Sequence, residues 1–298
     1  MMVNMRAVLL LPYLFIPATL ASAQSLTAGE AIHRIQMRYS APGITDTVDT
    51  VKAGDPATPV TGIATTFLDT MDVLREAARR GDNLVITHEP TFYNHRDDTA
   101  FFKDDPVYRE KLAFIESHHM VVFRLHDEIH SVAPDHIEVG LIEALGWQGY
   151  VKRNDPFSVT LPPIKLGALV DQLRNKLGAR TMRVIGDPNL SVSHVALRPG
   201  AAGMQDQVKT LRRDDVEVLI AGESSEWETV EYARDAVAQG RHKALILLGH
   251  EVSEEPGMEQ CAKDLREVFP GVRIDHIVAG QPMWNAEHPP SAAGTSSR

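Results

Sequence analysis

The chain has 298 residues, of which 43% are hydrophobic and 23% charged, a composition typical of a globular protein with a sizeable core. Its formal net charge of −10 at pH 7 argues against a general basic surface, so nucleic acid and anionic membranes are poor candidates for partners. Cys261 is the single cysteine, which excludes an intramolecular disulfide and a thiolate-cluster metal site.

Residues 1–23 have the pattern of a signal peptide. Arg6 provides the positive start, an uncharged apolar run follows at 7–20, and Ala-Ser-Ala at 21–23 forms a small-x-small cleavage site. No second run of about 18 apolar residues follows, so we expect an exported protein, periplasmic or secreted, that leaves the membrane after cleavage. An uncleaved N-terminal anchor is the alternative interpretation.

Short β-rich apolar runs alternate with helical patterns along the rest of the chain, which predicts an α/β fold with parallel strands. Strands are expected at 61–68, 83–87, 120–125, 192–197, 216–221, 244–248 and 272–278. Helices are expected at 72–80, 106–117, 137–145, 164–177, 204–211, 226–239 and 256–269.

The expected internal boundary lies at 155–163, a stretch that contains three prolines. It separates a first α/β domain, 24–155, from a second α/β segment, 156–284. The residues that follow, 285–298, are polar and rich in proline and serine, so we expect them to form a disordered tail.

Three clusters of histidine and acidic residues directly follow predicted strands, at 88–89, 126–130 and 250–254. In parallel α/β sheets, groups that follow strands meet at one edge although they lie far apart in sequence. Imidazole and carboxylate together suit zinc, manganese or iron, and a bridging carboxylate can hold two ions close together. The clusters bracket the middle of the chain, so we expect the C-terminal part of the second segment to pack back on the first domain, or the site to lie between domains.

Each cluster alone also fits a structural role, because a lone histidine at a strand end more often caps or supports its neighbours than binds a metal. His126 and His130 have the one-turn spacing of a helix, as do His250 and Glu254. Spacing does not establish that these segments are helical, and thirteen histidines make some chance coincidences inevitable.

Four stretches of the chain, in this order, carry a family resemblance: 61–90, 192–203, 218–223 and 247–258. The most specific is Gly-His-x-x-x-Glu-x-Pro-Gly at 249–257. The sequence resembles the dinuclear-metal-centre hexamer family, also called NIF-three-like, many of whose members are labelled GTP cyclohydrolase I type 2. The resemblance implies two α/β domains of NIF-three-like type, a metal site in the cleft at the C-terminal ends of strands, and assembly into a homo-oligomer, often a hexamer.

The resemblance also implies a ligand set with two exchanges. The family's paired histidines map to His88 and Glu89, so a carboxylate replaces the second imidazole. Its His-x-x-x-Asp motif maps to His126 and His130, so a histidine replaces the aspartate. The Gly-His-x-x-x-Glu motif maps intact. The expected ligands of one or two divalent ions are His88, Glu89, His126, His130, His250 and Glu254.

Other polar groups close to the clusters are secondary candidates. Asp127 and Glu128 are placed to orient a ligating histidine. His95 and Glu223 are candidates for the cleft, although a surface loop is the favoured place for His95. The glycine-rich 200–203 fits an anion cradle or, preferably, a tight turn, because the lysine of a phosphate loop is absent.

Three functional hypotheses follow. The first is a metal-dependent hydrolase of a small molecule, with Glu89 and His126 as the expected catalytic residues that move the proton of water. The second is a non-catalytic metal-binding or scaffold protein, because a family resemblance predicts fold better than reaction. The third is a metal-free α/β domain with incidental histidines. GTP is a poor candidate substrate, because an exported protein meets little of it.

Overall fold

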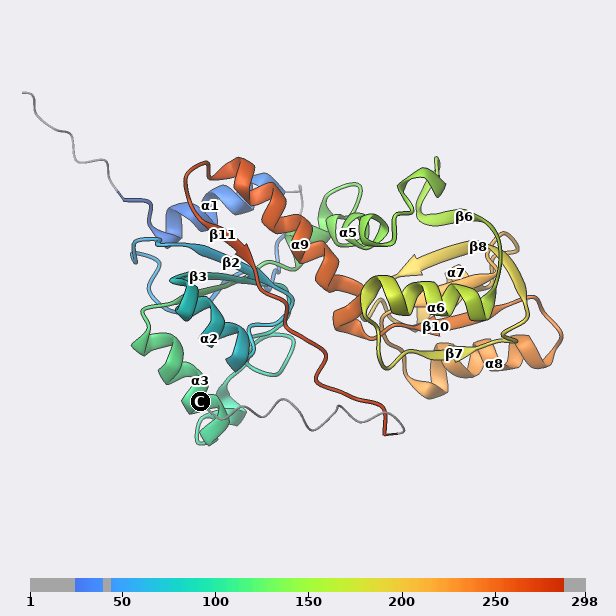
Figure 1. Cartoon of the computed structure of the whole chain (residues 1–298). Helices are drawn as coiled ribbons and strands as arrows, with labels where there is room; N and C mark the ends of the chain where they lie inside the picture. The colour runs from blue at the N-terminus through green and yellow to red at the C-terminus, as the bar shows by residue number, and fades with distance from the viewer. Residues whose placement is uncertain (1–24, 40–43, 287–298) are drawn as a thin grey trace, which may run out of the picture.

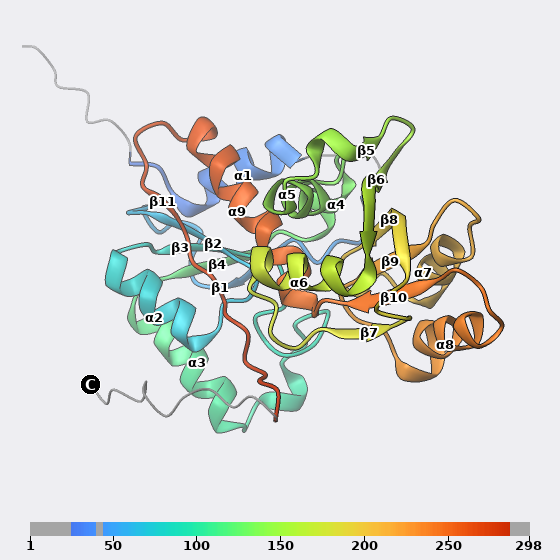
Figure 2. The same cartoon turned by 45° about the vertical axis from the view of Figure 1, so that its right-hand side comes forward.

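The computed structural model describes residues 25–39 and 44–286 (Figure 1). The predicted signal peptide at 1–23 lies outside these ranges, as does the predicted tail from residue 287 onward. Two β-sheets, each with helices on both faces, lie side by side (Figures 1 and 2). This arrangement confirms the predicted α/β fold class. Within the described ranges, every helix is too short or too polar to cross a membrane.

The first sheet has five strands in the order β1-β4-β3-β2-β11. Its strands are β1 (Val51–Ala53), β2 (Ile63–Thr66), β3 (Leu84–Thr87), β4 (Val121–Arg124) and β11 (Ile274–His276). β1 is antiparallel to β4, and the other pairs are parallel. The last strand of the chain thus lies at the edge of the first sheet, where Ile274 pairs with Ile63.

Helices on both faces bury this sheet, which explains why its strands are continuous apolar runs. α1 and α9 cover one face, α2 and α3 cover the other, and η1 precedes α3. The helices are α1 (Ala28–Tyr39), α2 (Met71–Arg80), η1 (Ala100–Phe102), α3 (Pro106–Ser117), α4 (Asp127–Ser131), α5 (His136–Leu145) and α9 (His250–Val268).

The second sheet has six strands in the order β5-β6-β8-β9-β10-β7, with β8, β9 and β10 parallel. Its strands are β5 (Val151–Lys152), β6 (Asp155–Lys165), β7 (Arg183–Ile185), β8 (Ser191–Arg198), β9 (Val218–Ala221) and β10 (Ala244–Leu247). α6 packs on one face and α7 and α8 on the other. The remaining segments are η2 (Gln148–Tyr150), α6 (Leu166–Leu177), α7 (Met204–Leu211), η3 (Glu226–Val230) and α8 (Glu231–Ala238).

Helix α5 belongs to both halves of the molecule. Its Ile137 lies in the core around the first sheet, whereas Leu141 lies in the core around the second. Between them, Gly140 contacts α9 so closely that a Cβ atom there would lie 2.4 Å from the carbonyl oxygen of Pro256. A Cβ atom on Gly257 would lie 2.6 Å from the Cα of Ile137. The glycines therefore let α5 and α9 cross at backbone distance and join the two halves.

Two predicted helices differ from the observed ones, and the stretch expected as the internal boundary forms a strand. The last long helix begins at His250, not at Pro256, because packing against α5 outweighs the hydrogen bond that an interior proline removes. The helix predicted at 226–239 is interrupted, since Glu228 has non-helical backbone angles (φ −114°, ψ −112°). The proline-rich 155–163 forms most of β6, whose pairing with β8 becomes irregular after Thr160, where prolines lack ladder donors.

Candidate metal centre

The expected ligands lie at the C-terminal ends of strands from both sheets. His88 and Glu89 follow β3, and His126 follows β4. His130 lies one turn later, in α4. The remaining two expected ligands follow β10 of the second sheet, where Gly249 (φ +100°) precedes α9 and the first turns of that helix begin. The helical start at residue 250 places His250 and Glu254 on one face, one turn apart.

The two carboxylates lie between the imidazoles. Oε2 of Glu254 lies 2.9 Å from Nε2 of His250 and 3.4 Å from Nε2 of His88, and its Oε1 is 4.0 Å from Nε2 of His130. Oε1 of Glu89 lies 3.4 Å from Nε2 of His250. The same oxygen is 3.6 Å from Nε2 of His126. All six expected ligands therefore form one cluster, which we call the His/Glu centre: His88, Glu89, His126, His130, His250 and Glu254.

Every imidazole of the centre has an acceptor at its other nitrogen. Nδ1 of His88 donates to the carbonyl oxygen of Leu125 at 3.0 Å. In the other three, Nδ1 faces a carboxylate, and these pairs are His126–Asp127 at 2.9 Å, His130–Asp135 at 2.8 Å and His250–Glu223 at 3.5 Å. Such partners fix the orientation and tautomer of metal-binding imidazoles and leave Nε2 free to bind. Here each Nε2 faces Glu89 or Glu254.

Two buried atoms of the centre test whether its residues fit a metal. Nε2 of His88 and Oε2 of Glu254 are inaccessible to solvent and, within the described ranges, make no hydrogen bond of good geometry, although Oε2 is ion-paired with His250 at 2.9 Å. Such atoms are costly unless a partner satisfies them. Ligand atoms of two triplets also lie within 4.8 Å of one another, namely His88 with His126 and His130, and His88 with Glu89 and Glu254. The donor set and its unsatisfied atoms fit a divalent metal ion.

Arg124 fixes the position of Glu89 and was not among the expected site residues. It ends β4, is fully buried, and its guanidinium lies 3.2 Å from Oε2 of Glu89 and donates from Nε to the carbonyl of His88 at 3.0 Å. Oε1 of Glu89 therefore remains directed at the imidazoles. The available signal was a single arginine in the apolar run Val-Val-Phe-Arg-Leu, since a buried arginine requires partners.

The N-terminus of α4 is held by Asp49, another residue that the sequence did not reveal. Its carboxylate accepts hydrogen bonds from the backbone N–H groups of His126, Asp127 and Glu128 at 2.8–3.0 Å. This cap satisfies donors that a helix start leaves free and keeps His126 in place. Asp135 acts similarly one helix later, because one carboxylate oxygen caps α5 while the other faces Nδ1 of His130.

The charges of the centre shift the pKa values of its groups in opposite directions. Burial lowers the pKa of His250, but Glu223, Glu254 and Glu89 together raise it to about 12. Burial raises the pKa of Glu254, but His250 and His88 hold it well below its usual range. Burial, with the neighbouring His88, lowers the pKa of His126 to about 4. A metal that enters the centre must therefore displace a proton from His250.

Some of the secondary candidates lie at the centre, and others do not. Asp127 and Glu223 face imidazoles of the centre, as described above, whereas Glu128 accepts from Gln36 at 3.2 Å, outside the centre. His95 lies beside the centre, with its ring centroid 5.9 Å from that of His126. The 200–203 loop does not cradle an anion, because a Cβ atom on Gly200 (φ +62°) would meet the Glu254 carboxylate at 2.0 Å. Gly200 therefore makes room for the carboxylate of Glu254.

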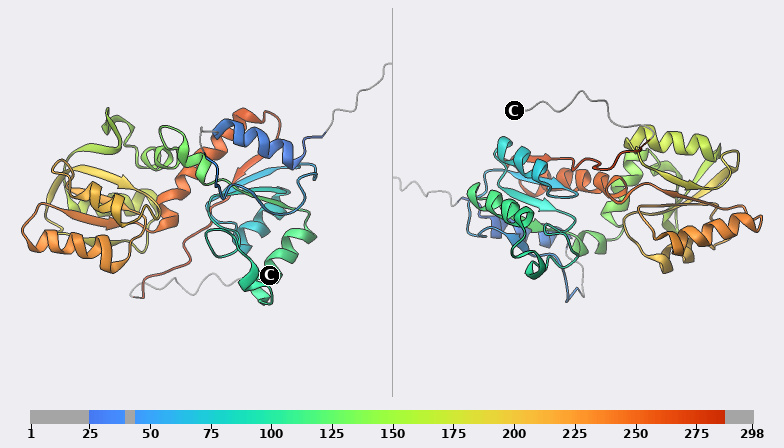
Figure 3. Two further views of the ribbon diagram at one scale, coloured as in Figure 1. Left: turned by 180° about the vertical axis from the view of Figure 1, so that it is seen from behind. Right: turned by 90° about the horizontal axis from the view of Figure 1, so that it is seen from below.

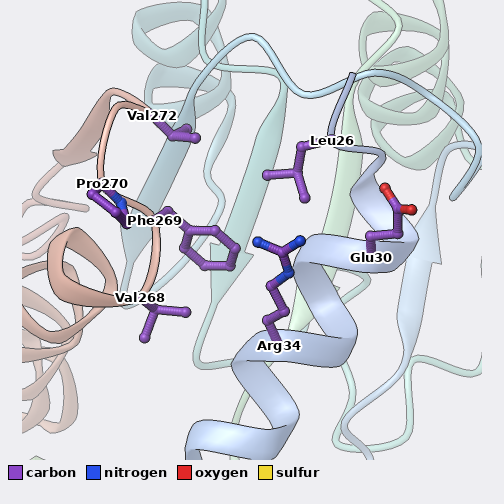
Figure 4. Close-up of a pocket in the computed structure, with 7 residues that line it drawn as sticks. All are labelled: Leu26, Glu30, Arg34, Val268, Phe269, Pro270 and Val272. Carbon is purple, nitrogen blue, oxygen red and sulfur yellow. The ribbon is translucent and has the colours of Figure 1, made fainter. Parts of the chain in front are cut away.

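A cleft of about 1320 Å³ adjoins the centre and is lined by residues of both halves. Glu89, His95, Glu223 and His250 form its wall on the side of the centre. A separate hollow of about 430 Å³ lies between α1 and the end of α9 (Figure 4). Arg34 lies over the ring of Phe269 there, 6.0 Å from its centroid, and the two hollows share no lining residue. The larger cleft is therefore the one that gives access to the His/Glu centre.

Together these features define a class of protein: two α/β halves with a His/Glu group, able to hold a metal, at the strand ends between them. The chain belongs to the Duf34/NIF3 (NGG1p interacting factor 3) family, whose model matches residues 34–282. The resemblance seen in the sequence is thereby confirmed.

Individual relatives agree with this assignment. A protein of Clostridium acetobutylicum named "GTP cyclohydrolase 1 type 2 homolog" is 25% identical over 223 residues, which cover 71% of this chain and 79% of that protein. The solved structure of ybgI, a protein of unknown function, has a TM-score of 0.68 at 21% identity and covers 87% of this chain and 100% of its own. A Bacillus cereus protein related to NIF3 has a TM-score of 0.68 at 16% identity, covering 86% of this chain and 97% of its own. These solved structures support the fold.

Proposed function

We propose that this protein binds one or two divalent metal ions at the His/Glu centre and uses them to hydrolyse a small molecule in the adjoining cleft. The observation that carries the proposal is the common orientation of the four imidazoles. Each has an acceptor at Nδ1 and faces a carboxylate with Nε2. Four histidines oriented in this way by three carboxylates and one carbonyl are typical of a metal site, whereas incidental histidines have no reason to converge.

The residues divide the chemistry between them. A bound divalent ion supplies Lewis acidity and makes water a nucleophile near neutral pH. Glu89 lines the cleft, whereas Glu254 is buried behind it, so Glu89 is the carboxylate in reach of a substrate. We assign Glu89 as the group that takes the proton of water, with His126 beside it at 3.6 Å. Arg124 holds the second oxygen of Glu89 and keeps the first directed into the site.

The substrate is proposed as a small molecule with a hydrolysable phosphoester or amide bond. The name of the Clostridium relative suggests GTP, but the glycine loop of this chain packs against Glu254 and offers no anion cradle. A carboxylate in that position repels phosphate groups. A nucleoside triphosphate is therefore the less suitable candidate.

A non-catalytic metal-binding protein is the alternative, and one observation favours it. Six protein ligands are enough to saturate a single ion, which would leave no open position for a substrate. Two ions sharing the six ligands would leave open positions towards the cleft. The number of ions bound therefore discriminates between the two functions.

The test is elemental analysis of the purified mature protein beside His88→Ala and His250→Ala variants. We expect about two equivalents of metal in the parent and loss in both variants, since the two residues lie in one centre although they are far apart in sequence. A single equivalent would favour the non-catalytic alternative. Failure of the parent to take up zinc, manganese or iron after reconstitution would refute the proposal. A hydrolase screen with the identified metal then tests the reaction.

Export and assembly complete the proposal. We propose that residues 1–23 direct export, which N-terminal sequencing of the mature protein tests, with Gln24 as the expected first residue. We also propose that copies of the chain assemble into a homo-oligomer, for which the family resemblance suggests a hexamer, and sedimentation measures its size directly.

A further inference from the structure

The cleft beside the His/Glu centre is lined by charges of both signs. Four acidic residues contribute to its lining, Asp72, Glu89, Glu223 and Glu251, together with two arginines of the second half, Arg180 and Arg183. Arg180 is exposed, and its side chain forms no ion pair with any residue in the described ranges. Arg183 pairs with Glu226 at 3.1 Å, but both side chains are exposed, so the pair is weak. Two guanidinium groups are thus available to an anion.

Large apolar side chains also line this cleft. Tyr93, Met182, Met283 and Trp284 line the cleft and come from three separate segments of the chain. Three of them remain substantially exposed: 49% for Tyr93, 67% for Met283 and 55% for Trp284. Exposed apolar groups that gather in a cleft, rather than singly over a surface, indicate a binding site.

The segment after β11 brings two of these side chains into place. It runs from the first sheet towards the second half (Figure 3), and its Ala279 donates to Oε2 of Glu255 at 2.9 Å. Further along, Gln281 accepts from the backbone N–H of Arg180 at 3.0 Å and donates to the carbonyl of Gly178 at 2.9 Å. These bonds attach the segment to both halves at Ala279 and Gln281, and Trp284, three residues further on, lines the cleft.

We propose that the cleft binds a small molecule with a planar apolar body and an anionic group, the body against Trp284 and Tyr93 and the anion at Arg180 and Arg183. The other end of the bound molecule would face the His/Glu centre, and only this part of the inference rests on the proposed function. Recognition of the ring and the anion needs no reaction, so binding measurements test it directly.

The probe is 1-naphthalenesulfonate, because its sulfonate is a weak metal ligand and separates anion recognition from metal binding. Binding to the mature protein is measured by calorimetry, with and without prior removal of metal by a chelator. Two comparison ligands carry one feature each: 1-naphthalenemethanol has the ring without the charge, and methanesulfonate has the charge without the ring. We expect the probe to bind at least about ten-fold more tightly than either. Equal affinity for the probe and the neutral alcohol would overturn the role of the arginines.

Variants of the cleft, each with a matched control, test whether the probe binds there. Trp284→Ala, and separately the double variant Arg180→Ala/Arg183→Ala, should each weaken binding of the probe by about ten-fold or more. Trp227→Ala is the control, because Trp227 is 81% exposed on η3 and does not line the cleft. Arg174→Ala, in an exposed pair with Asp171, is the control for charge. If the cleft variants bind the probe as the controls do, the proposal is wrong.

Measurements on the metal-free protein test ligand recognition in the cleft separately from metal binding at the His/Glu centre. It should bind the probe within about three-fold of the metal-containing protein, because the arginines and Trp284 do not belong to the His/Glu centre. A protein that takes up no metal but shows the selectivity for ring plus anion refutes the proposed function and leaves this inference intact. A protein that binds metal without that selectivity refutes only the inference.

Discussion

Glu254 and Glu255 are neighbours on α9, and both are buried, yet their surroundings are of opposite kinds. Glu255 accepts hydrogen bonds from the backbone N–H groups of Phe67 at 3.3 Å and Ala279 at 2.9 Å. It faces a single imidazole, that of His276, at 3.2 Å. Each of its oxygens has a backbone donor, and the carboxylate thereby joins β2, α9 and the chain after β11.

Glu254 has imidazoles in place of backbone donors. Three Nε2 atoms lie within 4.0 Å of its oxygens, and Oε2 is buried without a hydrogen bond of good geometry to any residue in the described part of the chain. The difference separates a structural carboxylate from a candidate ligand. A buried acid with backbone donors at both oxygens is complete within the protein, whereas one held by imidazoles, among them protonated His250, can exchange that proton for a metal ion.

The largest effect is expected when each of the two glutamates is replaced by glutamine in a separate variant. Glu254→Gln should weaken metal binding by about 100-fold or more, because an amide is a neutral and poorer ligand, whereas Glu255→Gln should change it by less than about three-fold. Competition with a chromophoric chelator measures both affinities. Equal losses in the two variants would show that the comparison does not identify ligands.

The carboxylates that face the Nδ1 atoms provide the next test. Asp135→Ala should lower metal affinity by about 10–100-fold without changing the stoichiometry, since His130 remains but loses the group that orients it. Glu128→Ala is the matched control, because its carboxylate faces Gln36 and not the centre. Asp135 also caps α5, so the unfolding free energy of each variant is measured beside its affinity. An unchanged affinity in Asp135→Ala would contradict the orienting role.

The pH dependence of stability should differ in sign between the neighbours. Burial raises the pKa of Glu255 from 4.5 to about 7, so the folded metal-free protein holds more protons in this window, and its stability falls as pH rises through it. Glu255→Gln should remove this fall, which we expect to be about 1–3 kcal/mol. The lowered pKa of Glu254 acts oppositely, since its contribution is lost as pH falls below its usual range. Urea unfolding of parent and variants, from well below pH 4.5 to above pH 7, measures both slopes.

The smallest effect is expected at Thr65, which supports the Glu255 side of the comparison. Its hydroxyl donates to the carbonyl of Met258 at 2.9 Å and lies 3.3 Å from Nδ1 of His276. Thr65→Val should destabilise the protein by about 1 kcal/mol, because the lost hydrogen bond is only partly offset. Metal affinity should not change. A shift in metal affinity with unchanged stability would mean that the two carboxylate regions are not independent.

The sequence predicted those parts of the site that follow strands. The three clusters carry their chemistry in local patterns, and the end of a parallel strand is a place where distant groups meet. The fold class followed in the same way from alternating strand and helix patterns. Helix α1 also has a readable signal, with a capping pair of Thr27 and Glu30 before buried apolar positions at helical spacing.

The remaining parts depend on contacts that no local pattern encodes. In the sequence, Arg124 is a single polar residue in an apolar strand. Its contact with the Glu89 carboxylate arises only in the folded chain. Asp49 lies far from α4 in sequence but caps it in space. The helical start at His250 was hidden by Pro256, because local propensity favours a helix that begins at the proline, whereas packing against α5 decides otherwise.

The crossing of α5 and α9 makes the molecule sensitive to a single methyl group. Gly140→Ala would place a carbon atom 2.4 Å from the carbonyl of Pro256, which lies less than one turn beyond Glu254 on the same helix. The added atom would push α9 away from α5 at this point and displace the expected ligands on its first turns, His250 and Glu254. The close approach that Gly140 permits therefore helps to set the spacing between the expected ligands that follow β3 and β4 and those on α9.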